Sequence, residues 1–132
     1  MRIAWVMAAA LALAGCSMGQ DMTATETAVN DFHRALDAGQ FATITDASGP
    51  EIRNGPTDFN ALLDTVHKKL GTLKTTVRQG FNDNYNNGDH LFTATYASVY
   101  ENGQASENFV FRLNSGKPVL AGYHVESAAL LR

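Results

Sequence analysis

The chain has 132 residues, of which 45% are hydrophobic, and a formal net charge of −3 at pH 7. A chain of this length is expected to form one domain and to bury a core without disulfides or structural metals. Its mild acidity and the absence of a basic stripe argue against a nucleic-acid partner. The same charge balance gives no electrostatic reason for binding to anionic lipid headgroups.

An uncharged apolar run follows the basic start of the chain, Met1-Arg2, and extends to about Leu13. This arrangement is typical of a secretory signal peptide. The run is shorter than the roughly 20 apolar residues that a membrane-spanning helix needs. We therefore expect a segment that is removed by processing, and not a permanent transmembrane helix.

The apolar run ends in Leu13-Ala14-Gly15-Cys16, which resembles the lipobox of bacterial lipoproteins. The resemblance implies cleavage before Cys16, diacylation of its thiol and, usually, acylation of the new amino terminus. Attachment through more than one acyl chain is stable, because each buried methylene contributes about 0.8 kcal/mol. The alternative is an ordinary secretory peptide that carries a cysteine beside its cleavage site.

Cys16 is the only cysteine, so no internal disulfide is expected. A free thiol is a liability in an oxidising compartment, and a lipid thioether would remove it. We expect a signal peptide at 1–15, a lipidated tether at 16–22 and a single domain at 23–132. The predicted location is the cell envelope. Because Ser17 and not aspartate follows the cysteine, the chain resembles lipoproteins that Gram-negative bacteria sort to the outer membrane, facing the periplasm.

Three helices are expected in the first half of the domain. The first covers about 23–38, because Thr23 and Glu26 fit a capping box and an apolar stripe follows. The second covers about 41–47, and a loop rich in Gly and Pro separates it from a third helix capped by Thr57. The apolar stripe of the third helix consists of Phe59, Leu62, Leu63, Val66 and Leu70.

The period of the apolar residues changes from 3.6 to 2 after Gly71, which predicts strands. A polar loop is expected over 82–88, and turns are expected at Asn102-Gly103 and Ser115-Gly116. This order indicates an α+β fold in which N-terminal helices pack on one face of a four-stranded antiparallel sheet. The four strands are expected at about 72–81, 90–100, 105–114 and 117–127. The first should have Leu73, Thr75 and Val77 on one face, and the last should alternate with Val119, Ala121, Tyr123 and Val125 on one face.

Three short segments, 35–41, 69–71 and 121–125, resemble those of small uncharacterised bacterial lipoproteins. Those lipoproteins belong to domain-of-unknown-function families in the nuclear-transport-factor-2-like superfamily. The segments read Ala-Leu-Asp-Ala-Gly-Gln-Phe, Lys-Leu-Gly and Ala-Gly-Tyr-His-Val, and the likeness covers most of 24–127. The chain departs from the pattern at Lys117-Pro118-Val119, where the families often have a tryptophan.

The resemblance implies a cone-shaped, cystatin-like fold in which a curved sheet wraps around helices and can leave a pocket between them. Some distant relatives use this pocket for isomerase or dehydratase chemistry, and many others only bind ligands or proteins. Fold alone does not select among these functions. No catalytic residue is carried over, because no catalytic motif of the families is matched.

The strongest catalytic candidates are His124 and Glu126, which lie on one face of the last predicted strand. A carboxylate in this position can orient an imidazole for general-base catalysis. The alternative is that both residues lie on the wet face, opposite Tyr123 and Val125. No metal or cofactor is expected, because none of the four histidines has the spacing of a zinc pair. These histidines are His33, His67, His90 and His124.

Aromatic residues at strand spacing are expected to form the core, with a small apolar pocket as the alternative. They are Phe92, Tyr96, Tyr100, Phe109, Phe111 and Tyr123. Two functions remain open. The first is a non-enzymatic, membrane-anchored lipoprotein that binds an envelope protein or a small apolar ligand. The second is a small-molecule isomerase, dehydratase or hydrolase that uses the cone. A homodimer formed through the open sheet face is compatible with either.

The lipid anchor is tested by Cys16→Ser. Because the diacylated thiol is the substrate of lipoprotein processing, this variant should accumulate as an uncleaved precursor that incorporates no palmitate. Labelling with radioactive palmitate, followed by electrophoresis, measures both effects. Normal labelling of Cys16→Ser would contradict the lipoprotein interpretation.

Overall fold

The computed structural model describes the backbone of residues 7–132 and the side chains of residues 19–132. The four strands form one antiparallel sheet in the order β1-β2-β3-β4. The elements are α1 (Met7–Asp37), α2 (Phe41–Ala47), α3 (Pro50–Arg53), α4 (Phe59–Leu70), β1 (Leu73–Asn86), β2 (Asp89–Tyr100), β3 (Gly103–Asn114), β4 (Lys117–Glu126) and the 3-10 helix η2 (Ala128–Leu131).

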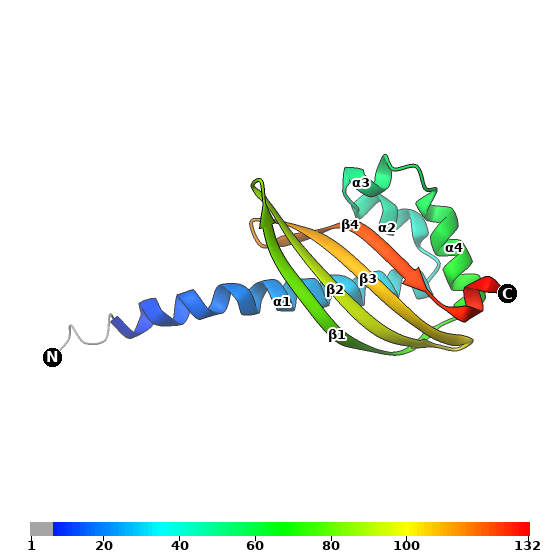
Figure 1. Cartoon of the computed structure of the whole chain (residues 1–132), viewed down its shortest axis with the longest axis horizontal. Coiled ribbons are helices and arrows are strands. Elements are labelled where there is room, and N and C mark those ends of the chain that lie inside the picture. The colour runs from blue at the N-terminus through cyan, green and yellow to red at the C-terminus, as the bar shows by residue number, and fades with distance from the viewer. Residues whose placement is uncertain (1–6) are drawn as a thin grey trace.

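Figure 1 shows a curved sheet crossed on one face by α1, with α2, α3 and α4 gathered beside β4 and η2 packed near α4. This arrangement confirms the predicted α+β class, with helices packed on a four-stranded antiparallel sheet. Within the described part of the chain, no helix combines the length and the apolar character needed to cross a membrane.

Helix α1 begins earlier than the sequence predicts. It continues without a break through 16–22, which the sequence suggests as an irregular tether. The capping box at Thr23 therefore does not form, because Thr23 lies inside the helix. The buried Thr25 hydroxyl instead donates to the carbonyl oxygens of the preceding turn. Gly19 alone does not end the helix, since a single interior glycine costs only about 1 kcal/mol. The lipidation prediction for Cys16 concerns a side chain outside those described.

The remaining helices follow the prediction closely. Helix α2 has the predicted bounds, and α3 is an additional turn that starts at Pro50, where a missing N–H costs nothing. Helix α4 is capped by Asp58 and not by Thr57: the Asp58 carboxylate accepts a hydrogen bond from the Ala61 N–H at 3.1 Å. The predicted apolar stripe of α4 is buried at Phe59, Leu63, Val66 and Leu70, with Leu62 half-buried.

Strand β1 is longer than predicted and presents a different face. The expected loop over 82–88 is mostly strand, and the turn narrows to Asn87-Gly88, whose φ values of 51° and 84° suit a tight hairpin. Two bulges near the start of β1 shift the alternation. As a result Thr76 and Arg78 are half-buried, and Val77 is exposed instead of packed.

Strands β2, β3 and β4 form the two predicted hairpins, and Phe109, Phe111 and Leu113 are buried on one face. A register shift opposite residues 110 and 111 breaks the expected alternation of β4. Leu120 is consequently the buried residue at that level, and the pattern that begins at Val119 does not continue through the strand.

The third predicted helix face can be tested through Leu63, which is fully buried. Leu63→Ala should lower the free energy of unfolding by about 2–5 kcal/mol, because it leaves a cavity in the core. Urea unfolding measures the effect. Leu131→Ala is the matched control, because Leu131 is exposed, and it should change stability by less than about 0.5 kcal/mol. Equal effects of the two substitutions would contradict the core assignment.

Candidate functional site

The most unusual group in the interior is the carboxylate of Glu107, on β3, whose side chain is 0% exposed. Ionised carboxylates are rarely buried unless several donors satisfy them. Four donors from three elements meet on Glu107: His33 Nε2 at 2.8 Å, Ser98 Oγ at 2.6 Å, Tyr100 OH at 2.9 Å and Tyr123 OH at 2.5 Å. We call these five residues the Glu107 cluster.

Strand geometry explains why these residues meet. Side chains two residues apart on a strand share a face. Glu107 therefore faces the interior with Phe109, and on the neighbouring β2 Ser98 and Tyr100 do the same. Helix α1 supplies His33 from across the layer, so the cluster joins α1 to three strands of the sheet.

The imidazole of His33 is buried, and among the described residues its Nδ1 atom has no hydrogen-bond partner. The Nε2 atom faces the Glu107 carboxylate and carries the proton that it donates to that group. The ring is held edge-on against Phe109, with their centroids 5.7 Å apart. His33 is thus a fixed donor to Glu107 inside an aromatic wall.

The donors decide the charge of the cluster. Burial by itself would raise the pKa of Glu107, but the interaction with His33, followed by the Ser98 and Tyr123 hydroxyls, outweighs burial and brings that pKa below its usual value. Burial and the neighbouring negative charge raise the pKa of Tyr100 and of Tyr123. At neutral pH the cluster therefore contains one carboxylate and two protonated phenols.

A carboxylate beside an imidazole is an arrangement that general acid–base catalysis uses. Here, however, both carboxylate oxygens already accept hydrogen bonds from within the cluster. Neither of the two apolar hollows of the described chain is lined by Glu107 or His33. The cluster as it stands is a closed network that connects elements.

One of these hollows, which we call the α1–α2 pocket, lies between α1, α2 and the β3–β4 part of the sheet. It has a volume of about 230 Å³. Its lining is mainly apolar and includes Ala28, Phe32, Ala35, Ile44, Phe111 and Leu120. Phe32 also packs against Tyr123 and Phe109, at centroid distances of 4.7 and 5.0 Å, so its ring stands between the pocket and the Glu107 cluster.

The second hollow is an open groove of about 1190 Å³ at the opposite end of the sheet. It runs along the ends of β2, β3 and β4 and under η2, and its lining includes Val99, Val125 and Leu130. It is larger than the α1–α2 pocket and somewhat more open, which favours a surface contact over capture of a small molecule.

The predicted pair on β4 does form a contact. His124 Nε2 lies 3.1 Å from Glu126 Oε1, but the two side chains are 71% and 75% exposed. Tyr123 and Val125 point the other way and pack partly against the core. The placement is the one described by the solvent-facing alternative, and His124 lines neither hollow, although Glu126 borders the open groove.

The sequence motifs do not single out Glu107, although β3 contains a pattern that points to this residue. The residues Phe109, Phe111 and Leu113 define the buried face of β3, and Glu107 continues that face at the same spacing of two. A charged residue at a position that belongs to the buried face of a strand is unusual, and it needs hydrogen-bond or ion-pair partners. The partner His33 is 74 positions away along the chain and could not be identified by spacing.

The aromatic residues expected in the core are mostly there. Five of the six are buried, and Tyr123 is half-buried against the core. His67 contacts Phe41, with their ring centroids 5.9 Å apart, and His90 pairs with Asp83 across the β1–β2 hairpin. Of the four histidines, only His33 therefore enters the Glu107 cluster.

Comparison with known proteins supports the fold and leaves the activity open. No family model matches the sequence, and no curated protein matches it. The structure is similar to the crystal structure of a putative dehydratase from the NTF2-like family from Streptomyces avermitilis, with a TM-score of 0.50. The match covers 82% of this chain and 96% of that chain at 12% identity. At this identity the similarity shows a nuclear-transport-factor-2-like fold.

The role of Glu107 is tested by Glu107→Gln, which keeps the shape of the side chain and removes its charge. At pH 7 the variant should be less stable by about 1.5–3 kcal/mol, the usual contribution of hydrogen bonds to a charged group. The native pKa of Glu107 lies below its unfolded value of about 4.3, so this stabilisation is present above that pH. It is lost as the pH falls through the native pKa.

Urea unfolding of the wild type and of Glu107→Gln between pH 7 and about pH 3 measures the difference. The difference should shrink on acidification, because the wild-type carboxylate becomes protonated. Glu126→Gln is the matched control at an exposed glutamate and should have little effect at any pH. A stability difference that does not change with pH would contradict an ionised Glu107.

Proposed function

We propose that this chain is a lipoprotein of the cell envelope, anchored through Cys16, whose nuclear-transport-factor-2-like domain binds a small apolar ligand and does not catalyse a reaction. The observation that carries the proposal is the separation of the buried polar cluster from the apolar pocket. The buried carboxylate and imidazole are closed off in the Glu107 cluster, and the α1–α2 pocket beside them is mainly apolar.

The shape and lining of the α1–α2 pocket support the proposal that its ligand is a small apolar molecule. Small-molecule sites are concave and mostly apolar, and those for drug-sized ligands usually have volumes of about 300–1,000 Å³. At about 230 Å³ the pocket suits a somewhat smaller molecule. Asp31 and Thr43 are among its few polar lining residues and could orient a polar end of the ligand.

The continuous helix α1 supports the proposal that the ligand is found close to the membrane. Cys16 and Ala28 are 12 residues apart on α1, which corresponds to about 18 Å along a helix. If Cys16 is lipidated as its sequence context predicts, the pocket stays within that distance of the anchor along α1. Small apolar molecules concentrate in and near the bilayer, so the anchor would bring the pocket to its ligand.

One observation favours the alternative, a small-molecule enzyme. His33 and Glu107 form a carboxylate–imidazole pair inside the cone, and Phe32 separates that pair from the α1–α2 pocket. Displacement of the Phe32 ring would bring the pocket and the pair together, and Glu107 would have to exchange one of its present donors for substrate. The binding function needs neither change.

The binding proposal is tested with 1-N-phenylnaphthylamine, an apolar dye whose fluorescence increases in an apolar site. Ala28→Leu should fill part of the α1–α2 pocket and weaken dye binding at least about tenfold, since a clash of one to three kcal/mol is typical of overpacking. Ala61→Leu is the matched control, because Ala61 is exposed on α4, and it should bind the dye like the wild type.

Thermal unfolding of both variants checks that each is folded. Equal dye binding by the wild type and Ala28→Leu would contradict the pocket assignment, as would wild-type protein that does not bind the dye. A dye that binds Ala28→Leu normally but is lost on substitution of Val99 would place the ligand in the open groove instead.

A further inference from the structure

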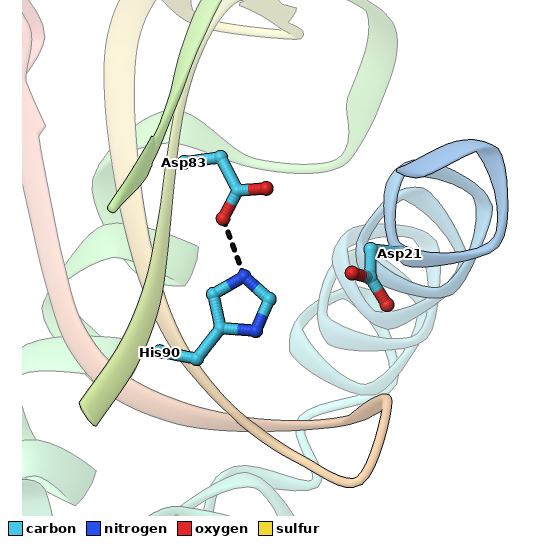
Figure 2. A group of neighbouring side chains, drawn as sticks. All are labelled: Asp21, Asp83 and His90. Carbon is cyan, nitrogen blue, oxygen red and sulfur yellow. Dashed lines mark hydrogen bonds and ion pairs between the residues drawn. The ribbon is translucent and has the colours of Figure 1, made fainter. Parts of the chain in front are cut away.

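A second group of polar side chains lies apart from the Glu107 cluster, where α1 passes the β1–β2 hairpin. Figure 2 shows Asp83 and His90 joined across the hairpin, with Asp21 on the neighbouring turn of α1. We propose that Asp21, Asp83 and His90 bind a divalent transition-metal ion of the zinc class. This inference does not depend on the proposed ligand of the α1–α2 pocket.

The positions of the donor atoms support the proposal. One ligand atom from each residue lies within 4.8 Å of the other two. Zinc binds imidazole nitrogen and carboxylate oxygen at about 2.0–2.2 Å, so two donors of a tetrahedral ion are about 3.4 Å apart. Small rotations of the carboxylates are sufficient to reach that geometry. In the present arrangement Asp83 Oδ1 lies 2.5 Å from His90 Nε2, so a metal ion would replace this contact.

The charges around the group favour a cation. Among the described residues Asp21 has no ion pair, and Asp83 pairs only with His90. Two arginines of the sheet are engaged elsewhere: Arg78 pairs with Glu26, and Arg112 pairs with Glu51 and Asp89. Two carboxylates therefore lie near a single imidazole that pairs with only one of them, and a divalent ion would neutralise both.

The donors are also held in place before any ion binds. The side chains of His90 and Asp83 are only 13% and 17% exposed. The Tyr85 ring stacks on the imidazole of His90 with their centroids 4.0 Å apart and the planes 14° from parallel. This packing fixes the plane of the imidazole and so reduces the entropy lost on coordination. The backbone of Asp21 is held in α1.

The donor set selects the class of metal. One nitrogen and two carboxylate oxygens suit zinc and its neighbours in the transition series, whereas calcium and magnesium prefer oxygen ligands alone. Three protein ligands leave at least one coordination position for water or for a donor from a partner. The ion would fasten α1 to the β1–β2 hairpin five residues after Cys16, and so fix the direction in which the helix leaves the sheet.

The spacing of these residues explains why no metal site is expected from the sequence. Asp83 and His90 are seven residues apart on two strands, and Asp21 belongs to a helix more than 60 residues earlier. The unpredicted extensions of β1 and α1 bring the three together, because Asp83 falls in the expected loop and Asp21 in the expected tether.

Isothermal titration of ZnCl₂ into the untagged full chain in detergent tests the proposal. All proteins carry Cys16→Ser, which removes the one thiol that could bind zinc by itself. The expected result is one ion per chain, a higher melting temperature with zinc and much weaker binding of CaCl₂. Asp21→Asn, Asp83→Asn and His90→Gln should each weaken zinc binding at least about tenfold, the smallest loss usual for a disturbed metal site.

The matched control is His124→Gln, because His124 and Glu126 form an exposed imidazole–carboxylate pair without a third donor. This variant should bind zinc like the parent. Asp21→Asn is the decisive variant, since it leaves the Asp83–His90 pair intact. Zinc binding unchanged by Asp21→Asn, loss of binding in His124→Gln, equal affinity for calcium or no binding of zinc would each overturn the proposal.

Discussion

The burial of one carboxylate organises this fold. An ionised Glu107 inside the cone costs several kcal/mol unless its oxygens are bonded, and four donors from α1, β2 and β4 supply those bonds. All four donors must be in place together, because a buried polar network with unsatisfied groups makes the fold less stable than an apolar core would. The position of α1 across the sheet, and with it the shape of the space beside α2, follows from this requirement.

The same constraint connects structure to function. The polar groups that a nuclear-transport-factor-2-like cone could offer to a substrate are occupied in holding α1 to the sheet, and Phe32 closes them off from the α1–α2 pocket. What remains accessible on that side is an apolar space close to the predicted lipid anchor. A binding role needs only this space, whereas catalysis requires Phe32 to move and a network of hydrogen bonds to open.

The sequence predicts those features that local periodicity controls. The bounds of α2, the buried face of α4 and the turns at Asn102-Gly103 and Ser115-Gly116 follow from nearby residues, and so does the α+β class. Features set by distant contacts are missed. The bulges that turn Val77 outward depend on the pairing of β1 with β2, and Glu107 finds His33 only once α1 crosses the sheet.

The rate at which the Nε2 proton of His33 exchanges with solvent tests the central claim most directly. If the Glu107 cluster is a sealed structural network, the Nε2 proton of His33 is shielded from water and held in a hydrogen bond. Proton–nitrogen NMR of the imidazole should then show a persistent Nε2–H resonance that exchanges slowly with solvent and stays unchanged when an apolar dye binds. A resonance lost to rapid exchange, or one that shifts strongly on binding, would show an open cone and contradict the account.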